Sequence, residues 1–363
     1  MTIQTAEIED ILMGKQAIPT FDKAIYQSIQ NRWDQIAKPL RSFGKLEEVH
    51  ARIGAIQGQS VPDFQSMELL VCCADHGIVE EGVSQSDQSV TAICAENIGR
   101  GQSTAGILAA SAGAGITAVD VGMNQPEPVP STLYRRVVKG TRNFLREPAM
   151  TQAEFHQALQ VGLNLVKDSK KQGITLLGIG EMGIGNTTSA AVLTGKLLRL
   201  TADAVLGPGA GLSQEGLSRK KRVIEKALSM DVPEDAESIG CAFGGLELAA
   251  MSGIIVGGAL YGIPVILDGM LSQVSALMAE RLTPGVKEFL IPSHESKEPA
   301  SKALCQALGL EPIIQGNMAA GEGTGAALMM SLLKPVDRVY REAKRFDGYG
   351  MEPYEHYERS PEE

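Results

Sequence analysis

The sequence predicts an α/β protein whose large domain holds a mostly parallel, Rossmann-like sheet flanked by helices. A small helical domain from both chain termini completes the predicted fold. From about Met67 onward, short apolar runs that end in polar or glycine-bearing turns alternate with longer Ala-rich stretches, which is typical of βαβ units. At 363 residues the chain exceeds the size at which one hydrophobic core usually stops growing. Aromatics make up only 4% of the residues and glycines number 40, which favours tightly packed helices on a sheet.

Two sets of segments carry this prediction. Strands are expected where a short apolar run precedes a turn: Glu68–Ala74, Ile116–Val121, Ile174–Ile179, Pro264–Asp268 and Phe289–Ile291. Helices are expected over the longer stretches: Ala153–Lys171, Thr187–Leu200, Ser218–Leu228, Gly245–Tyr261 and Gly323–Leu333. The longest apolar stretch, Ala249 to Leu267, has the length of a membrane-spanning helix but is interrupted by glycines and Pro264. We interpret it as a core helix followed by a buried strand.

The chain ends are more polar and lack strand signals. We expect residues 1–60 and 334–363 to pack together as the small helical domain, and residues 61–333 to form the large domain that carries the active site. The last dozen residues, rich in Glu, Pro and Tyr, are expected to form a solvated tail.

Charge and cysteine content exclude several functions. A net charge of −10 argues against nucleic-acid binding, which needs a basic surface. The five cysteines show no metal-ligand spacing, so no metal site is predicted and a reduced cytosol is the simplest setting. The first twenty residues carry Glu7, Glu9 and Asp10 and lack the pattern of a signal peptide. The expected protein is cytoplasmic, with no membrane partner.

In an open parallel sheet the ligand lies beyond the carboxyl ends of the strands, so the loops after the predicted strands are the informative ones. The first such loop contains Asp75 and His76, which are suited to acid–base chemistry. The alternative is that Asp75 caps a turn completed by Gly77. Because no nucleophile motif lies nearby, we favour the turn and expect the loop to line the site.

The second loop, residues 178–188, contains a formal G-x-G-x-x-G, and Asp203 lies about twenty residues on, as in a dinucleotide-binding fold. Glu181 would place a negative charge inside that turn, which disfavours a pyrophosphate. We prefer a loop leading through Asn186 and Thr187 into a helix whose N-terminal amides meet an anion or a polar ring substituent. The alternative is that the glycines serve only close packing.

The third loop, residues 207–211, is a glycine turn followed by a predicted helix that carries Arg219, Lys220, Lys221 and Arg222. Exposed amides of such a turn, together with one of these cations, suit a phosphate monoester. The alternative is a solvated basic helix face. We expect one cation to serve the site, since an acidic protein must concentrate positive potential to hold a phosphate.

The fourth loop places Glu322 between Gly321 and Gly323. The glycines leave the backbone open to a ligand, and the small apolar residues before Glu322 can raise its pKa by desolvation, which suits a general base. Alternatively, Glu322 is a first-turn residue stabilised by the dipole of the following helix. The residues alone do not choose between the two.

Together these segments resemble the nicotinate-nucleotide:dimethylbenzimidazole phosphoribosyltransferase family of cobamide lower-ligand activation. The resemblance covers nearly the whole chain, and several long motifs in one order are far more specific than any one of them. The matching segments are Lys38–Glu47, Ala74–Gly77 (ADHG), Gly180–Thr188 (GEMGIGNTT), Gly244–Gly253 (GGLELAAMSG), Pro264–Gly269 (PVILDG), Ile291–Ser296 (IPSHES) and Gly321–Leu328 (GEGTGAAL).

The resemblance implies a dimeric enzyme that needs no cofactor. Ribose 5-phosphate would pass from nicotinate mononucleotide to an aromatic base with inversion at C1′, giving an α-riboside and free nicotinate. By the same matching, Glu322 is the family's base, Gly207, Gly209 and Lys220 hold the phosphate, and Glu181, Gly183, Asn186 and Thr187 hold the nicotinate and ribose. The acceptor pocket would comprise Ser86, Cys94, Met182, Met318 and Ala320.

The sequence departs from the family pattern at Cys94, where members that use benzimidazole typically have a glutamine. A thiol is a weaker and smaller hydrogen-bonding partner. Relatives that ribosylate phenols, in some cases as heterodimers, make phenol or p-cresol an alternative acceptor. Two other functions stay open: a non-catalytic subunit paired with an active homologue, and a nicotinamide-dependent dehydrogenase based on the G-x-G-x-x-G match.

Overall fold

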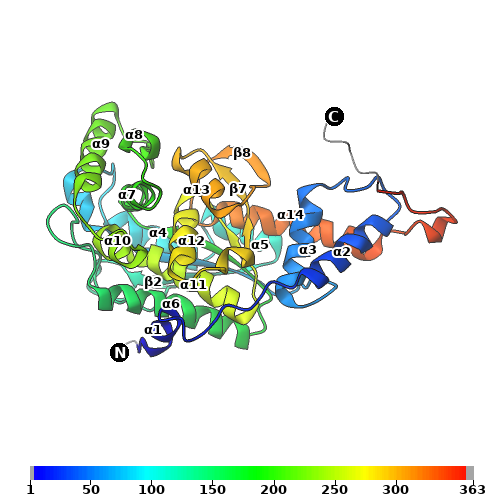
Figure 1. Ribbon diagram of the computed structural model, residues 1–363. Helices are drawn as coiled ribbons and strands as arrows, with labels where there is room; N and C mark the ends of the chain where they lie inside the picture. The colour runs from blue at the N-terminus through cyan, green and yellow to red at the C-terminus, as the bar shows by residue number, and fades with distance from the viewer. Residues whose placement is uncertain (1–3, 357–363) are drawn as a thin grey trace.

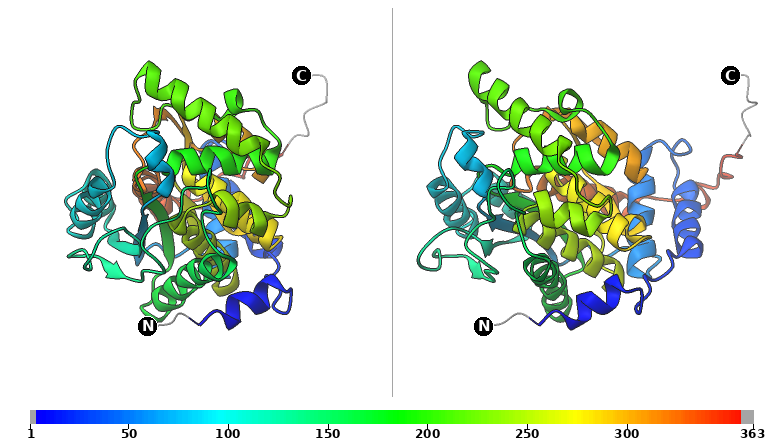
Figure 2. Two further views of the ribbon diagram at one scale, coloured as in Figure 1. Left: turned by 90° about the vertical axis from the view of Figure 1, so that its left-hand side faces the viewer. Right: turned by 60° about the vertical axis from the view of Figure 1, so that its left-hand side comes forward.

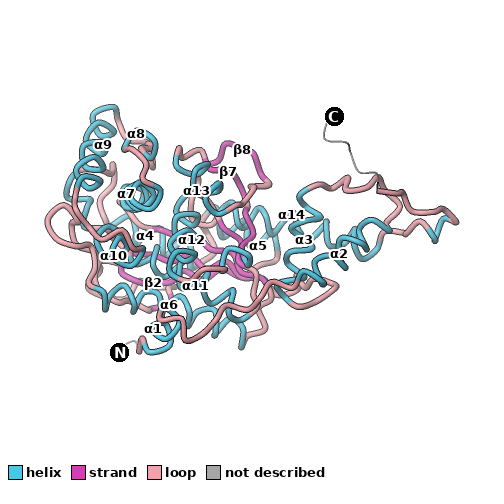
Figure 3. Tube along the Cα trace, in the orientation of Figure 1, coloured by secondary structure: helices cyan, strands magenta, loops and turns pink. Residues whose placement is uncertain are grey.

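The centre of the molecule is a parallel sheet of six strands in the order β3-β2-β1-β4-β5-β6 (Figures 1 and 3). This computed structural model describes residues 4–356. The expected tail over the last dozen residues lies mostly outside the described residues. The strands are β1 (Met67–Ala74), β2 (Gly115–Gly122), β3 (Leu133–Tyr134), β4 (Leu176–Met182), β5 (Val265–Leu267) and β6 (Leu290–Pro292). Every pairing within this sheet is parallel, so all carboxyl ends lie along one edge.

The predicted α/β class is confirmed, and each of the five expected strands lies within a few residues of an observed one. Three short strands were not predicted: β3 in the main sheet, and β7 (His294–Ser296) paired in parallel with β8 (Ile314–Met318). The sequence of β8, IQGNM, lacks the apolar run that marks a buried strand, because all of its residues are partly or fully exposed. For this reason β8 was not predicted. β7 and β8 form a separate two-stranded sheet above the main one (Figure 3).

The two faces of the main sheet are covered by different helices. Successive side chains of a strand point to opposite faces, and on β4 a Cβ at Gly178 would approach Met330 of α14 (Thr324–Glu342). Its neighbours therefore face the other side, where α11 (Leu246–Tyr261) contacts β1, β2, β4 and β5. The α14 face also carries α4 (Ser89–Gly99) and α5 (Thr104–Ala112). The expected core helix within Ala249–Leu267 is α11, which is buried over most of its length.

Helix α6 (Gln152–Lys171) packs on α11 at very short range, which two glycines permit. A Cβ added at Gly162 would lie 1.9 Å from the carbonyl oxygen of Ala250, and one at Gly253 would lie 1.9 Å from that of Leu159. Atoms do not approach this closely, so a methyl group at either glycine must force the two helix backbones apart.

We therefore expect Gly253→Ala to lower the free energy of unfolding by about 1–3 kcal/mol, as overpacking of a close-packed core does. Gly348→Ala is the matched control, because a Cβ there meets nothing within 4 Å and its backbone is not left-handed. Chemical denaturation of both variants measures the difference. Equal stability of the two would show that the α6–α11 contact yields without cost.

The remaining helices surround the carboxyl edge and the outer faces. They are α7 (Asn186–Leu198), α8 (Ala202–Val205), α9 (Gln214–Ser229), α10 (Ala236–Phe243), α12 (Met270–Leu282) and α13 (Ala300–Leu308), with 3₁₀ turns at Gly77–Glu81, Val286–Phe289 and Asp347–Tyr349. All five predicted helices are present. The one over Gly323–Leu333 extends much further, to Glu342, because its buried stripe continues through Val336 and Tyr340.

A second cluster of helices lies beside the sheet domain, at the right of Figure 1. Here α2 (Lys23–Gln35) and α3 (Lys45–Gln57) pack against the C-terminal half of α14. Their shared core consists of Ile29, Trp33, Ile36, Ala51, Val336 and Tyr340. Both chain ends thus contribute to it, as expected of the small helical domain.

Helix α1 (Ala6–Leu12) does not join this cluster. It lies along α6 of the large unit, with Ile8 and Ile11 in the main core (Figure 2). The backbone N–H of Ile8 donates to the side chain of Gln160 at 2.9 Å. Because α14 also runs through position 333 without a break, the division of the chain at residues 60 and 334 stays a prediction. Among the described residues, no helix combines the length and apolar character needed to cross a membrane.

Candidate active site

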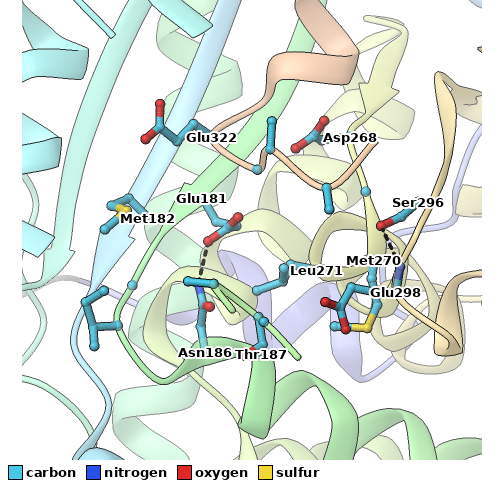
Figure 4. A pocket seen from close by; sticks show the side chains of 18 of the residues that line it. Glu181, Met182, Asn186, Thr187, Asp268, Met270, Leu271, Ser296, Glu298 and Glu322 are labelled. Atoms are coloured by element: carbon cyan, nitrogen blue, oxygen red, sulfur yellow. Dashed lines mark hydrogen bonds between the residues drawn. The ribbon is translucent and has the colours of Figure 1, made fainter. Parts of the chain in front are cut away.

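A cavity of about 1100 Å³, which includes the space open to solvent at its mouth, lies at the carboxyl edge of the sheet. Its walls come from the loop after β1, the end of β4 with the start of α7, the residues after β5, the segment after β7, and the turn before α14. Figure 4 shows carboxylates from three of these elements, Glu181, Asp268 and Glu322, around one part of the cavity. The parallel topology therefore gathers the loops that the sequence singled out.

The Glu322 side chain is presented by a turn with an unusual backbone. Gly321, Glu322 and Gly323 have φ of 71°, 59° and 84°, so three consecutive residues are left-handed. A residue with a side chain rarely adopts this conformation, and such strain gathers at functional sites. The turn also lies directly against β4, where a Cβ at Gly180 would be 2.4 Å from the backbone nitrogen of Gly323.

Helix α14 begins at Thr324, so Glu322 lies before the helix and not in its first turn. The alternative that Glu322 is a dipole-stabilised first-turn residue is therefore wrong. The N-terminal amides of α14 are satisfied instead by Asp268, whose two carboxylate oxygens accept from Gly323 N at 3.1 Å and Gly325 N at 2.7 Å.

Carboxylates crowd this part of the cavity. Burial raises the pKa of Glu322, Ser103 opposes the shift, and the charge of Asp268 adds to it. Burial, followed by the charges of Glu247 and Asp268, raises the pKa of Glu181 to about 8, although the amide of Asn186 donates to it. Glu181 is therefore mostly protonated at pH 7, which relieves repulsion beside Glu322.

The Asp75-His76 pair is a buried structural element. Both residues are fully buried, and Asp75 accepts from the backbone nitrogen of Asn124 at 2.7 Å, which ties the loop after β1 to the loop after β2. The His76 ring bonds Ser189 at 2.9 Å and Glu247 at 2.7 Å. His76 does not line the cavity, and the expectation that this loop supplies no base stays a prediction. Because Asp75 accepts from Asn124 and not from the turn at Gly77, the predicted turn cap is wrong.

The opposite part of the cavity suits an anion. Of the four adjacent cations in the middle of α9, Lys220 turns inward and is 1% exposed, while Lys221 pairs with Asp203 at the surface. Lys220 donates to the hydroxyl of Thr187 at 2.9 Å and to the carbonyl of Gly207 at 3.0 Å. Burial lowers the pKa of Lys220 to about 8, against the favourable charge of Glu298. Gly209, left-handed at φ 55°, brings the turn against Thr187 and Lys220.

The predicted site residues differ in where they lie relative to the cavity. Those that line the cavity are Glu181, Met182, Gly183, Asn186, Thr187, Gly209, Ala320 and Glu322. Gly207 and Lys220 lie directly behind the lining, through the hydrogen bonds just described. Ser86, Cys94 and Met318 are not part of the lining, although the charge of Glu322 contributes to the raised pKa of the Cys94 thiol and so places the two near each other. The roles of all these residues stay predictions.

The sequence reasoning missed Asp268, Ser296 and Glu298 as individual lining residues. Asp268 directly follows β5 at the carboxyl edge of the main sheet, and this position was the usable signal for it. Ser296 and Glu298 belong to the β7 segment, which was not predicted as a strand. Glu298 packs so closely on Gly207 that any Cβ there would meet its carboxylate.

The G-x-G-x-x-G match does not form a dinucleotide-binding turn. Gly178 and Gly180 lie inside β4, where they admit α14 and the Glu322 turn, so they are not in a loop after the strand. Asp203 lies on α8 at the surface. Gly178 and Gly180 therefore serve close packing of β4 against α14 and the Glu322 turn, as the alternative interpretation of this loop proposed.

An open parallel sheet with a carboxylate at one end of the cavity along its carboxyl edge, and a buried lysine behind the lining at the other end, suits the binding of a small phosphorylated ligand. A family profile described as Phosphoribosyltransferase matches residues 18–350. The chain belongs to the nicotinate-nucleotide–dimethylbenzimidazole phosphoribosyltransferase family, as the resemblance implied.

Similar proteins cover the chain almost completely. The nicotinate-nucleotide–dimethylbenzimidazole phosphoribosyltransferase of Clostridium acetobutylicum is 36% identical over 349 residues, which span 96% of this chain and 98% of the relative. That of Acetivibrio thermocellus is 38% identical over 329 residues, 90% of this chain and 94% of the relative. The crystal structure of CobT from Thermus thermophilus superposes with a TM-score of 0.85 at 38% identity, covering 91% of this chain and 99% of that one.

Proposed function

We propose that the protein transfers ribose 5-phosphate from nicotinate mononucleotide to an aromatic lower-ligand base of the dimethylbenzimidazole type, releasing nicotinate and forming an α-riboside in cobamide biosynthesis. The observation that carries the proposal is one cavity that has the left-handed Glu322 turn in its wall and the buried cation of Lys220 directly behind its lining. Family membership supplies the substrates named.

The residues suit the bond changes of this reaction. The nicotinate of the donor is already a pyridinium cation, so the C1′–N bond can break without an acid to protonate the leaving group. One ring nitrogen of the acceptor forms the new bond to C1′, and Glu322 accepts the proton that the other ring nitrogen loses. Burial raises the pKa of Glu322, which makes its ionised carboxylate a stronger base.

The donor would lie with its phosphate at the turn of Gly207 and Gly209, where Lys220 and the N-terminal amides of α7 concentrate positive potential. The protonated carboxyl of Glu181, next to Asn186, offers a hydrogen-bond donor in place of a charge. We propose that Glu181, Gly183, Asn186 and Thr187 hold the nicotinate and ribose between the two ends.

The test is release of nicotinate from nicotinate mononucleotide by the purified protein, with dimethylbenzimidazole, adenine, phenol and p-cresol offered together and products identified by mass. We expect release that depends on an acceptor and an α-riboside phosphate as product. If no acceptor yields nicotinate, the proposed activity is wrong. Activity that appears only after a homologous chain is added would favour the alternative of a non-catalytic subunit.

The identity of the acceptor depends on Cys94 of α4. Burial and the nearby charge of Glu322 raise the pKa of its thiol. Ser86, Met182, Met318 and Ala320 are the other residues proposed for the acceptor pocket. A thiol cannot replace an amide as a partner for a benzimidazole nitrogen, so we keep a phenol or p-cresol as an alternative acceptor. A phenol has a pKa of about 10, and a water activated by Glu322 would then relay its proton.

Cys94→Gln is expected to shift acceptor preference toward benzimidazole by about 1 kcal/mol, the net value of one hydrogen bond, or roughly fivefold in relative kcat/KM. The measurement is direct competition of dimethylbenzimidazole against p-cresol in both proteins. Cys94→Ala is the matched control, since it changes the pocket without adding an amide. An unchanged ratio in Cys94→Gln would show that position 94 does not select the acceptor.

We also propose that the enzyme works in the cytoplasm as a dimer, either of two copies or with a homologous subunit. The family resemblance supports the dimer. Sedimentation velocity of the chain alone distinguishes the two assemblies, because a heterodimeric enzyme leaves the isolated chain monomeric.

A further inference from the structure

Asp268 lies in the PVILDG segment of the family resemblance, but none of the substrate assignments gives it a role. It follows β5 directly and is 4% exposed, and both oxygens of its carboxylate are used. One accepts the backbone N–H of Gly325 at 2.7 Å and the other that of Gly323 at 3.1 Å. Gly323 directly follows Glu322 and is the N-cap of α14, and Gly325 lies in the first turn of that helix. Asp268 is thus bonded to the backbone that carries the proposed base.

Within the Glu322 turn, the backbone nitrogen of Thr324 donates to the carbonyl of Gly321 at 2.9 Å, and further contacts from outside fix its shape. Three consecutive left-handed residues cost conformational energy, and such a backbone persists only when its surroundings fix it. β4 supplies one constraint. Because Gly180 has no side chain, the turn packs directly on the backbone of β4 and cannot move further toward the strand. Asp268 supplies the other, because it fixes the backbone at Gly323 from the opposite side. Figure 4 shows Asp268 and Glu322 on the two sides of this turn.

We infer that Asp268 is the positioning residue of the active site: by holding the amides of Gly323 and Gly325, it sets where the Glu322 carboxylate points. This inference rests on the proposed function, in which Glu322 is the base. A base must lie within hydrogen-bond reach of the proton that it removes, so displacement by about 1 Å costs on the order of 10²-fold in rate.

Asp268 also acts on Glu322 through its charge. The charged or titratable groups around Glu322 are Asp268 after β5, Glu181 on β4 and Cys94 on α4, while His294 of β7 lies 3.7 Å from Asp268. Burial raises the pKa of Asp268, and His294 with the glycine amides opposes this. The anionic form of Asp268 raises the pKa of Glu322. Removing that charge must therefore lower the pKa of Glu322.

The experiment is Asp268→Asn in the full chain. Asparagine keeps one acceptor but turns an NH₂ group toward a backbone N–H donor, which cannot bond to it. We expect kcat to fall about 10- to 100-fold, with little change in KM for nicotinate mononucleotide. We also expect the acidic limb of the pH–kcat profile to move to lower pH, because Glu322 loses a neighbouring negative charge. A purely structural role would not move that limb.

Asp120→Asn is the matched control. Asp120 is another buried aspartate of the same sheet, which accepts from Met123 N at 2.9 Å and pairs with Arg136, but it does not line the cavity. Its loss should lower stability and leave the acidic limb in place. Thermal unfolding of both variants separates loss of folded protein from loss of turnover.

If Asp268→Asn does not fold, Asp268→Glu serves instead, since it keeps the charge and displaces the oxygens. A fall in kcat with the acidic limb unmoved then supports the inference, and unchanged kcat overturns it. For Asp268→Asn, an unchanged kcat or an unmoved acidic limb overturns it. Glu322→Gln is assayed in parallel to separate failure of the inference about Asp268 from failure of the proposed function. If Glu322→Gln retains full turnover, Glu322 is not the base, whatever the Asp268 variants show.

Discussion

Glu322→Gln is expected to lower kcat by about 10²–10⁴-fold, the usual contribution of a positioned general base, which corresponds to ~3–5 kcal/mol of barrier. Glutamine matches the shape of glutamate and can adopt the same place in the turn, but its amide oxygen does not accept a proton at neutral pH. Steady-state release of nicotinate measures the loss.

The fold and the binding of the donor should survive this substitution. The Glu322 side chain takes no part in the hydrogen bonds that hold the backbone of its turn, which join Thr324 N to the carbonyl of Gly321 and the amides of Gly323 and Gly325 to Asp268. Calorimetric titration with nicotinate mononucleotide should therefore give an affinity close to that of the unaltered protein. Weak binding together with slow turnover would mean that Glu322 positions the substrate and that another group takes the proton.

The unaltered enzyme should also report the environment of this carboxylate through pH. Since the pKa of Glu322 is raised above the usual value of a glutamate, kcat should decline as the pH falls through that raised pKa, where the base becomes protonated. The limb should be absent in Glu322→Gln.

The sheet and the loops at its carboxyl edge were predictable because their signals are local. An apolar run such as Glu68–Ala74 and the glycine turn around Glu322 are each visible within about ten residues, and parallel topology brings such loops together. Whether Glu322 is a general base or a first-turn residue of the following helix was not predictable, because the answer depends on where α14 begins. That start is set by Asp268, which is more than fifty residues away in sequence and becomes a neighbour only when β5 is in place.

The inward turn of Lys220 shows the same limit. The run Arg219–Arg222 contains four adjacent cations of similar kind, and only the helical phase of α9 against Thr187 and Gly207 selects the one that is buried. Likewise, the sequence gives no sign that α1 packs on α6, since Ile8 and Ile11 are a short apolar pair that suits either helical cluster.

Lys220→Met is expected to raise KM for nicotinate mononucleotide by about 10- to 100-fold, from loss of a charge-assisted hydrogen bond of about 1.5–3 kcal/mol, with a smaller change in kcat. Methionine fills the same buried space without the charge. Lys196→Met is the matched control, because Lys196 also donates to two backbone carbonyls, those of Leu228 and Met230, but it lies outside the cavity lining.

The pH dependence of KM gives this prediction its sharper test. Burial lowers the pKa of Lys220 to about 8, so the free enzyme loses the cation as the pH rises through about 8, and KM should climb above that pH. Below about 6 the donor's phosphate itself gains a proton, so binding should be tightest between these values. The climb above pH 8 must vanish in Lys220→Met and persist in Lys196→Met; a climb that survives in Lys220→Met would place the phosphate-binding charge on another residue.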